Sequence, residues 1–461
     1  MIPAPFNMPR SRLPGWFVPL ACGVIQFLNW TQQASGGCQP TEDAYSRQSP
    51  GSVTSIASFD CSEPARTGTV VSSEGLHPPL AGTAESSKAL TKDEAAAAVS
   101  ALWTARLEFL RKDRRAETDT RELVIGELKM PFWYKVFGDA PANGRSLFIS
   151  MHGGGGAPAE VNDRQYENQK QLYEPEEGVY LVPRAATNTW DLWHQSHIDQ
   201  FFDRLITNMI VFENVNPDRV YLMGYSAGGD GVYQLAPRLA DRLAAAAMMA
   251  GHPNESRPEG LRNIGFALHM GALDSAYNRN SVAKEWGIRL DDLQAADPGG
   301  YVHEVVLHEG RGHWMNREDA VAVPWMAKFD RNPWPKKIVW VQDDVIHPRF
   351  YWLKLDAEAS DSPNSSDGTG TGIAKAGDEI VASTDGNTIR IEKCTARRLR
   401  LLLSDELLNL DEPVTVILPD GSQTTHHAVR TIATIAESLR DRNDPVAVPF
   451  AEIIVDVSTD P

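Results

Sequence analysis

The residues best suited to chemistry lie at 221–229, where the apolar run YLM leads into GYSAGG. A serine flanked by closely spaced glycines, on the turn between a strand and a helix, is typical of a nucleophile elbow. Gly224 and Gly228 have no side chains, so strand and helix can approach each other at this turn. The amides that begin the helix would favour negative charge beside Ser226. An ordinary Gly-Ser turn is the alternative, but the strand-turn-helix setting favours acyl transfer from Ser226.

A second glycine-rich segment, HGGGG at 152–156, follows the apolar run LFISM. Acyl transfer passes through a tetrahedral oxyanion that needs two preorganised N–H donors, each worth roughly 3 kcal/mol. We expect these donors to be the amides of Gly154 and Ala227, because glycines let the loop come close. The Gly-Lys-Ser/Thr and G-x-G-x-x-G spacings of phosphate-binding loops are missing after it. A plain flexible loop remains the other alternative.

A serine hydroxyl needs a general base, and the base needs an orienting acid. Downstream of Ser226, the apolar run at 266–268 leads into HMGALD, and we expect Asp274, just past that strand, to be the acid. A further apolar run, VVL, leads into HEGRGHW. We expect the base to be His313, in the glycine-flanked loop beyond the strand. His308 is the alternative, but it sits at the strand end and could be merely packed.

Aromatic residues accompany these candidates. The loop after the expected strand at 178–183 contains NTWDLWH, and two more rings adjoin Ser226 and His313 in the sequence. Loops at the carboxyl edge of an open α/β sheet commonly bind ligands. We therefore expect a substrate pocket lined by Trp190, Trp193, Tyr225 and Trp314. Alternatively, two of the tryptophans belong to the core, because Trp is commonly buried.

Short apolar strands alternate with helical stretches from residue 120 onward, which predicts an α/β fold with a mainly parallel sheet flanked by helices. The expected strands are 122–137, 145–151, 178–183, 219–224, 243–249, 264–270 and 301–307. The expected helices between them include 199–214, 227–240 and 281–295. Upstream, residues 91–112 have helical apolar spacing and a Thr-x-x-Glu capping signal, so a further helix is expected there.

The amino-terminal 90 residues are expected to lie outside the folded domains. Two arginines precede an apolar run at 13–30 and small residues follow, so we interpret 1–36 as a secretory signal. The sequence around Cys22 resembles a relaxed lipobox, which makes a lipid anchor there an alternative, and an apolar leader without a targeting role is another. Residues 37–90 are rich in Ser, Thr, Gly and Pro and read as a disordered linker. These features indicate a secreted, periplasmic or surface-attached protein.

Two folded domains are expected after the linker. The catalytic pattern occupies 91–331, and the prolines of NPWPKK at 332–337 mark a boundary. Residues 338–461 alternate apolar and polar residues, which predicts a small, mostly antiparallel β-sandwich-like domain. We expect a polar insert at 357–377 and one helix at about 427–442.

Composition excludes several classes of protein. The formal net charge of −17 over 461 residues disfavours nucleic-acid binding, because no basic surplus exists to displace counterions. No apolar stretch reaches the roughly 18 to 20 residues of a membrane-spanning helix. Four scattered cysteines without C-x-x-C spacing predict neither structural zinc nor a disulfide scaffold. In an oxidising compartment Cys38 and Cys61 could form one disulfide; free thiols are the equal alternative, and Cys394 stays unassigned. The proposed chemistry needs no metal or organic cofactor.

Taken together, H-G-G-G-G, G-Y-S-A-G-G, H-x-G-x-x-D and G-R-G-H-W resemble the polyhydroxybutyrate-depolymerase, feruloyl-esterase and dienelactone-hydrolase-like branch of the α/β-hydrolases. The resemblance covers roughly residues 120–330. It implies Ser226 as nucleophile, Asp274 as acid and His313 as base. It also implies ester substrates, including hydroxyacid polyesters, hydroxycinnamates and acylated polysaccharides, often outside the cell.

The carboxyl-terminal part resembles a small β-sandwich appended to exported hydrolases of planctomycete-type bacteria, and it could bind carbohydrate or act as a spacer. Two other functions stay open for the whole chain. One is a serine peptidase of the prolyl-oligopeptidase kind, although no propeller repeat precedes the catalytic pattern. The other is an inactive hydrolase scaffold that serves as a surface binding protein. The sequence does not fix the ester substrate or the oligomeric state.

Overall fold

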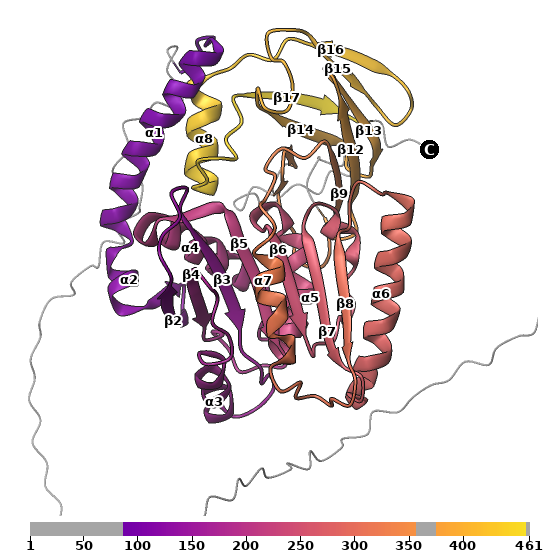
Figure 1. The fold of residues 1–461 in the computed structure, drawn as a ribbon. Coiled ribbons are helices and arrows are strands. Elements are labelled where there is room, and N and C mark those ends of the chain that lie inside the picture. The colour runs from indigo at the N-terminus through magenta and orange to yellow at the C-terminus, as the bar shows by residue number, and fades with distance from the viewer. Residues whose placement is uncertain (1–85, 356–374, 458–461) are drawn as a thin grey trace, which may run out of the picture. The chain divides into compact units, whose positions relative to one another are not determined.

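The computed structural model describes residues 86–355 and 375–457 (Figure 1). The expected signal at 1–36, the lipid anchor at Cys22 and nearly all of the linker at 37–90 fall outside the described residues. Most of the expected polar insert at 357–377 falls outside them as well.

An eight-stranded sheet forms the centre of the catalytic region (Figure 1). Its spatial order is β1-β2-β4-β3-β5-β6-β7-β8, and all neighbours from β4 to β8 are parallel. β2 is antiparallel to both β1 and β4. This is the strand order of the α/β-hydrolase fold, so the predicted fold class is confirmed. The strands are β1 (Glu122–Ile125), β2 (Leu128–Phe137), β3 (Arg145–Met151), β4 (Gly178–Pro183), β5 (Val215–Tyr225), β6 (Ala245–Met249), β7 (Gly265–Gly271) and β8 (His303–His308).

The segment expected as one strand at 122–137 is instead a hairpin of β1 and β2. Ile125 pairs with Leu128, so the chain reverses over Gly126 and Glu127. Gly126 has a φ of 59°, a left-handed conformation that tight hairpin turns require. Leu123 and Ile125 alternate in one register and Leu128 and Met130 in the other, so the apolar pattern shifts by one residue at the turn.

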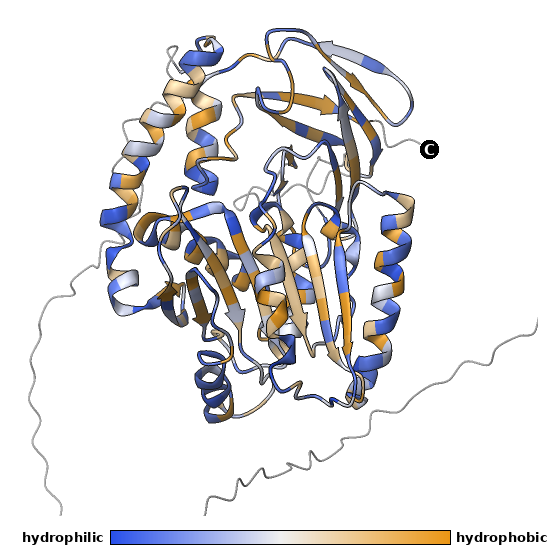
Figure 2. Ribbon diagram, viewed as in Figure 1, coloured by the Kyte–Doolittle hydropathy of each residue, from blue (hydrophilic) through white to orange (hydrophobic). Residues whose placement is uncertain are grey.

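Helices cover both faces of this sheet, and its central strands are strongly apolar (Figure 2). The expected helices occur as α4 (Ser196–Glu213), α5 (Ala227–Arg238) and α6 (Arg279–Ala296). α4 buries Phe201, Phe202 and Leu205, which lie on one side of an amphipathic helix. The sequence analysis missed three short helices, α2 (Arg115–Thr120), α3 (Ala159–Gln169) and α7 (Ala322–Met326).

The carboxyl-terminal region contains two further sheets, with spatial orders β16-β15-β13-β12-β9 and β10-β11-β14-β17 (Figure 1). All neighbours are antiparallel except β13 and β15, so the predicted mostly antiparallel domain is confirmed. Trp340, Phe350 and Trp352 are buried in its core. The strands are β9 (Lys337–Val341), β10 (Arg349–Phe350), β11 (Leu353–Lys354), β12 (Glu379–Asp385), β13 (Thr388–Cys394), β14 (Arg398–Leu403), β15 (Val414–Ile417), β16 (Gln423–His426) and β17 (Ala451–Asp456).

The helix expected at 91–112 is α1 (Lys92–Asp113), and it begins with the predicted capping box. The Thr91 N–H donates to Glu94 Oε2 at 2.8 Å, and the Glu94 N–H donates to Thr91 Oγ1 at 3.3 Å. α1 packs against α8 (Ile432–Arg442) through a small buried cluster that includes Ala95 and Ile435. A helix expected at the start of the catalytic region therefore lies against the carboxyl-terminal region in space (Figure 1).

The carboxyl-terminal region also contacts segments that come just before strands of the large sheet. The Lys337 carbonyl accepts a hydrogen bond from the side chain of Asn263, which precedes β7. Tyr351 donates its hydroxyl to the carbonyl of Ala240, which precedes β6. These contacts lie at the amino ends of the parallel strands, whereas ligands of open α/β sheets bind beyond the carboxyl ends.

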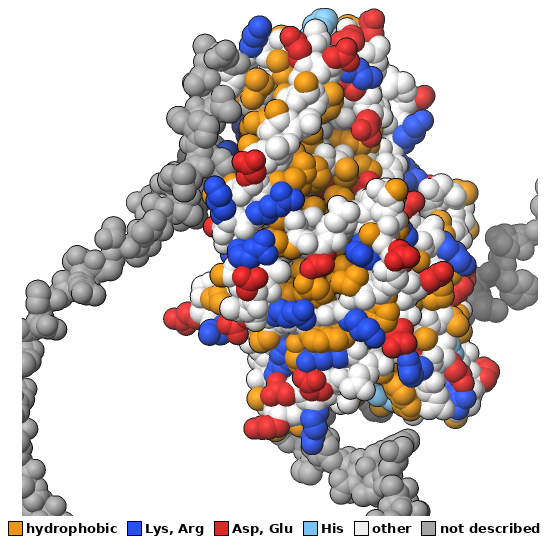
Figure 3. Space-filling view, turned by 60° about the vertical axis from the view of Figure 1, so that its left-hand side comes forward, with side chains coloured by type: hydrophobic (Ala, Val, Ile, Leu, Met, Phe, Trp, Pro, Cys, Tyr) orange, Lys and Arg blue, Asp and Glu red, His pale blue; other side chains and the backbone are white. Residues whose placement is uncertain are grey.

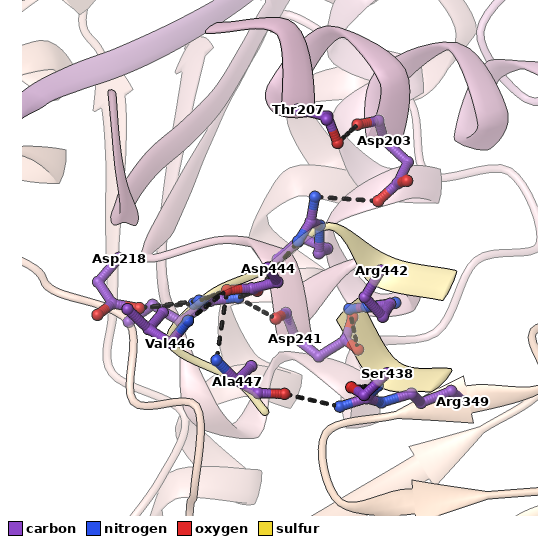
Figure 4. A network of polar contacts seen from close by, with 12 residues as sticks. Asp203, Thr207, Asp218, Asp241, Arg349, Ser438, Arg442, Asp444, Val446 and Ala447 are labelled. Atoms are coloured by element: carbon purple, nitrogen blue, oxygen red, sulfur yellow. Dashed lines mark hydrogen bonds and ion pairs between the residues drawn. The ribbon is translucent and has the colours of Figure 1, made fainter. Parts of the chain in front are cut away.

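A buried ion network joins the two regions (Figure 4). Asp444, which follows α8, accepts from Arg331 Nη1 at 2.7 Å and from Arg242 Nη1 at 3.0 Å. Arg331 also donates from Nε to Asp218 at 2.9 Å. Although burial alone would raise it, the pKa of the Asp444 carboxyl is held well below its ordinary value by the Arg331 and Arg242 guanidiniums. The formal charges of these four residues cancel, because Arg331 and Arg242 are balanced by Asp444 and Asp218.

Replacing Asp444 by Ala is expected to destabilise the protein by about 3–5 kcal/mol, because two buried guanidiniums lose their shared carboxylate. Urea denaturation of purified protein measures this loss. Asp456→Ala is the matched control, since Asp456 pairs with Arg398 at 2.9 Å but both side chains are largely exposed. Equal midpoints for the two variants would contradict a structural role for the network.

A groove of about 660 Å³ runs between α1, α4 and α8, and none of the predicted catalytic residues lines it. The face with α1 turned forward carries Lys, Arg, Asp and Glu side chains among hydrophobic ones (Figure 3). Several arginines lining the groove are paired with acids, as in Arg204 with Glu117 and Arg442 with Asp241. We interpret the groove as the seam where these helices meet.

Candidate active site

The turn between β5 and α5 has the geometry of a nucleophile elbow. Ser226 has φ 58° and ψ −121°, a strained conformation for a residue with a side chain. A Cβ on Gly224 would lie 2.2 Å from the Gly228 carbonyl oxygen, and one on Gly228 would lie 2.2 Å from the Met151 carbonyl oxygen. Glycine is therefore required at both positions, for the reason that the sequence pattern predicts.

The structure brings Ser226, His313 and Asp274 into one line of hydrogen bonds. His313 Nδ1 lies 2.7 Å from Asp274 Oδ2, and His313 Nε2 lies 2.9 Å from Ser226 Oγ. Because the carboxylate can only accept, Nδ1 carries the proton and Nε2 is free to accept from the serine hydroxyl. Asp274 is 3% exposed, whereas the His313 side chain is 43% exposed. The arrangement can deprotonate Ser226 at a surface that a substrate can reach.

The loop that carries His313 is held by Tyr225, the residue just before the serine. Its hydroxyl donates to the His313 carbonyl at 2.6 Å and accepts from the Met315 N–H at 3.0 Å. Gly271 lies against the same loop, because a Cβ there would be 2.0 Å from the Gly312 carbonyl oxygen. The sequence analysis assigned Tyr225 to the substrate pocket. The structure gives it a nearly buried position and a bracing role instead.

His308, the alternative base, does not contact Ser226 in the structure. Its Nε2 lies 3.1 Å from Nδ1 of His269 on the neighbouring strand β7. Burial lowers the pKa of His269 to about 3, with a smaller contribution from His308. This pair packs under the His313 loop, as expected for a histidine at the strand end.

The HGGGG loop lies against the nucleophile. A Cβ built on Gly153 would be 3.2 Å from Ser226 Cβ. Burial lowers the pKa of His152 to about 3, so its ring is neutral at pH 7. That ring donates from Nδ1 to the Gly153 carbonyl at 2.6 Å and accepts at Nε2 from the Ala185 N–H at 3.2 Å. His152 is thus a structural anchor of the loop.

The two predicted oxyanion donors border Ser226 from different elements. Ala227 is the first residue of α5, where backbone N–H groups have no partner within the helix. Gly154 is exposed, and no partner of its N–H appears among the described residues. The neighbouring Gly155 N–H is already used, because it donates to Asn162 Oδ1 at 3.0 Å. This favours Gly154 over Gly155 as the loop donor.

The four aromatic residues predicted to line the pocket divide into two groups. Trp193 is fully buried against Phe202, and its indole N–H donates to the His152 carbonyl at 2.9 Å, so its assignment to the pocket is wrong. It belongs to the core; the alternative interpretation placed two of the tryptophans there, and the structure places one. Trp190 and Trp314 are 65% and 42% exposed. Trp190 lies beside Gly155 and Gly156 of the glycine loop.

Two more exposed apolar side chains lie in the segment after β7 that carries Asp274. Leu273 and Tyr277 flank Asp274 in the loop after β7, and they are 65% and 76% exposed. The sequence analysis did not single them out, although their position after the strand could have indicated them. Together with Trp190 and Trp314, they form an exposed apolar rim, a name we keep for these four residues.

Within residues 86–355 and 375–457, no group of three or more His, Cys, Asp or Glu side chains is arranged to hold a metal ion. No helix in the same ranges combines the length and apolar character that crossing a bilayer requires.

Comparison with curated proteins finds two partial similarities to esterases. The bifunctional acetylxylan esterase/xylanase XynS20E of Neocallimastix patriciarum is 32% identical over 121 residues, which cover 25% of this chain and 17% of that protein. "Putative esterase NocK" of Nocardia uniformis subsp. tsuyamanensis is 30% identical over 157 residues, covering 32% of this chain and 46% of that protein. The chain thus matches less than half the length of either relative. No family model matches it.

Solved structures similar to this chain include esterases. A thermostable esterase gives a TM-score of 0.36 at 18% identity and covers 46% of this chain and 62% of its own. The feruloyl esterase module of Clostridium thermocellum, complexed with sinapinate, gives 0.31 at 13% identity and covers 45% of this chain and 90% of its own. At scores this low, the fold assignment rests on the strand order and the turn at Ser226.

Proposed function

We propose that this chain is a serine hydrolase that cleaves carboxylic esters through an acyl-enzyme. The proposal rests above all on the continuous hydrogen bonding from Asp274 through His313 to Ser226, on an elbow with φ 58°. The partial similarity to two proteins named as esterases supports ester rather than peptide substrates.

The proposed reaction uses only side chains and amides of this chain. Ser226 Oγ attacks the ester carbonyl carbon while His313 Nε2 takes its proton. The Gly154 and Ala227 amides stabilise the oxyanion that forms. When the tetrahedral intermediate collapses, the C–O bond to the alcohol breaks and His313 returns the proton to the leaving oxygen. A water molecule then attacks the acyl-enzyme in the same way, with His313 as the base. This second step releases the carboxylic acid and regenerates free Ser226.

We further propose that the substrate ester belongs to a large molecule, such as a polyester or an acylated or feruloylated polysaccharide. The support is the exposed apolar rim: Trp190 lies beside the glycine loop, Trp314 follows His313 and Leu273 precedes Asp274. Exposed apolar side chains that gather on one surface commonly mark binding sites. Export, expected from the amino-terminal sequence, would bring the enzyme to such substrates.

A panel of p-nitrophenyl acetate, p-nitrophenyl butyrate, methyl ferulate and short peptides tests the reaction class. We expect the esters to be cleaved and the peptides to be left intact. Faster turnover of peptides would favour the peptidase alternative. If no ester is cleaved and a fluorophosphonate does not label the protein, the inactive scaffold would be the correct function.

Trp190→Ala is expected to raise KM for methyl ferulate about tenfold, because an exposed ring that stacks on the substrate is lost. KM for p-nitrophenyl acetate should hardly change, since that acyl group is too small to reach the ring. Steady-state kinetics measure both values. Ile288→Ala, which removes an exposed apolar side chain from α6, is the control and should alter neither. An equal loss on both esters would contradict a binding role for Trp190.

A further inference from the structure

Asn162, in the first turn of α3, is fully buried beneath the glycine loop. Its Oδ1 accepts from the Gly155 N–H at 3.0 Å, and its Nδ2 donates to the Gly155 carbonyl at 3.3 Å. One side-chain amide therefore satisfies both polar groups of a single buried glycine. Oδ1 faces a donor and Nδ2 faces acceptors, so the orientation of the amide is determined by its partners.

The same side chain excludes any residue but glycine from the preceding position, Gly154. A Cβ on Gly154 would lie 2.1 Å from Asn162 Oδ1. Gly154 and Gly155 also have φ values of 117° and 99°, which residues with side chains rarely adopt. A run of four glycines has little conformational preference of its own, so this conformation depends on what holds it.

Asn162 also connects the glycine loop to the loop that carries Trp190. Its Nδ2 donates to the Ala157 carbonyl at 3.2 Å and to Asn188 Oδ1 at 3.1 Å. Asn188 is held in turn by the Arg184 guanidinium, which pairs with Asp163 at 2.8 Å. One buried amide thus ties together two loops that border Ser226.

We propose that Asn162 is a positioning residue for the oxyanion hole. Its side chain accepts the Gly155 N–H and holds the loop so that the Gly154 N–H is left to donate to the substrate carbonyl oxygen. This inference rests on the proposed function, because an oxyanion forms only if Ser226 acylates. Asn162 does not touch the substrate. It acts through the loop, so its loss should affect the transition state more than substrate binding.

Asn162→Ala and Asn162→Asp test this proposal in the full chain. Active sites are first titrated with a fluorophosphonate, and kcat and KM for p-nitrophenyl acetate are then measured per titrated site. We expect Asn162→Ala to lower kcat about 100-fold with little change in KM. The misplaced Gly154 N–H would no longer stabilise the oxyanion of the transition state. The affinity for phenylboronic acid, which forms a tetrahedral adduct on the serine, should fall along with kcat.

Gln169→Ala is the matched control, because Gln169 is a buried amide on the same helix that donates to Ser150 Oγ at 2.8 Å. It should lower thermal stability as Asn162→Ala does, yet leave kcat and boronate affinity unchanged. Asn162→Asp keeps the shape of the side chain and the acceptor for the Gly155 N–H, so it should fold and retain part of the activity. It therefore tests the proposal even if the Ala variant does not fold.

Two outcomes separate the two proposals. If wild type is titrated and active, but both Asn162 variants match Gln169→Ala in kcat and boronate affinity, the positioning role is wrong and the esterase proposal stands. If wild type is neither labelled nor active, the proposed function fails and the inference fails with it.

Discussion

Replacing Ser226 by Ala is expected to lower kcat for p-nitrophenyl butyrate by about 10⁶-fold and to abolish labelling by a fluorophosphonate. The methyl group of alanine cannot form the acyl-enzyme. His313 Nε2, which lies 2.9 Å from Ser226 Oγ in the wild type, then has no hydroxyl proton to accept. The residual rate would come from the oxyanion donors and substrate binding alone. Stopped-time product assays at high enzyme concentration, together with gel detection of the label, measure both effects.

Ser256→Ala is the control for this experiment. Ser256 is a buried serine whose hydroxyl has no hydrogen-bond partner among the described residues, so its loss should leave both stability and activity nearly unchanged. Labelling that survives Ser226→Ala would assign the nucleophile elsewhere and contradict the proposed mechanism.

Asp274→Asn should lower kcat by about 10⁴-fold while the fold is preserved. The carboxylate now accepts from His313 Nδ1 at 2.7 Å, which keeps the proton on that nitrogen. An amide can turn its NH₂ toward the ring, in which case Nδ1 becomes the acceptor and Nε2 carries the proton. Such a histidine cannot take the serine proton. Kinetics on p-nitrophenyl acetate, with melting curves as a check on folding, measure the effect.

Asp230→Asn distinguishes the orientation of His313 by a hydrogen bond from the effect of a negative charge in the same region. Asp230 is a half-buried carboxylate on α5 that accepts from the His252 N–H, and it makes no hydrogen bond to His313. Its replacement should cost far less activity than Asp274→Asn. If the two variants lost equal activity, the general negative charge of the region would matter more than the hydrogen bond to His313.

The sequence predicted the nucleophile, acid and base positions that the structure brings together. Ser226, Asp274 and His313 each follow an apolar strand, and parallel strands place their carboxyl ends at one edge. Gly224 and Gly228 could be interpreted from sequence because only residues without side chains fit so close a contact. Such steric requirements leave a local signature. Their catalytic roles stay predictions until the variants above are measured.

Long-range packing left no such signature. Trp190 and Trp193 are three residues apart in one loop, yet one is exposed and the other is fully buried. The path of that loop decides the difference, and composition does not specify the path. Asn162 lies in a polar segment for which the sequence predicted no helix, and only the folded loop reveals its contacts. The contact of α1 with α8 joins segments more than 300 residues apart, which no periodicity could indicate.

The position of the carboxyl-terminal region has a consequence for how the molecule could be held on a support. Its contacts near Asn263 and Ala240 lie at the amino ends of the parallel strands, while Ser226 and His313 lie beyond the carboxyl ends. A chain tethered through its carboxyl-terminal region would present the exposed apolar rim outward. The buried ion pairs of Asp444 with Arg242 and Arg331 join the two regions, so such a tether would leave the side of the sheet that carries Ser226 free.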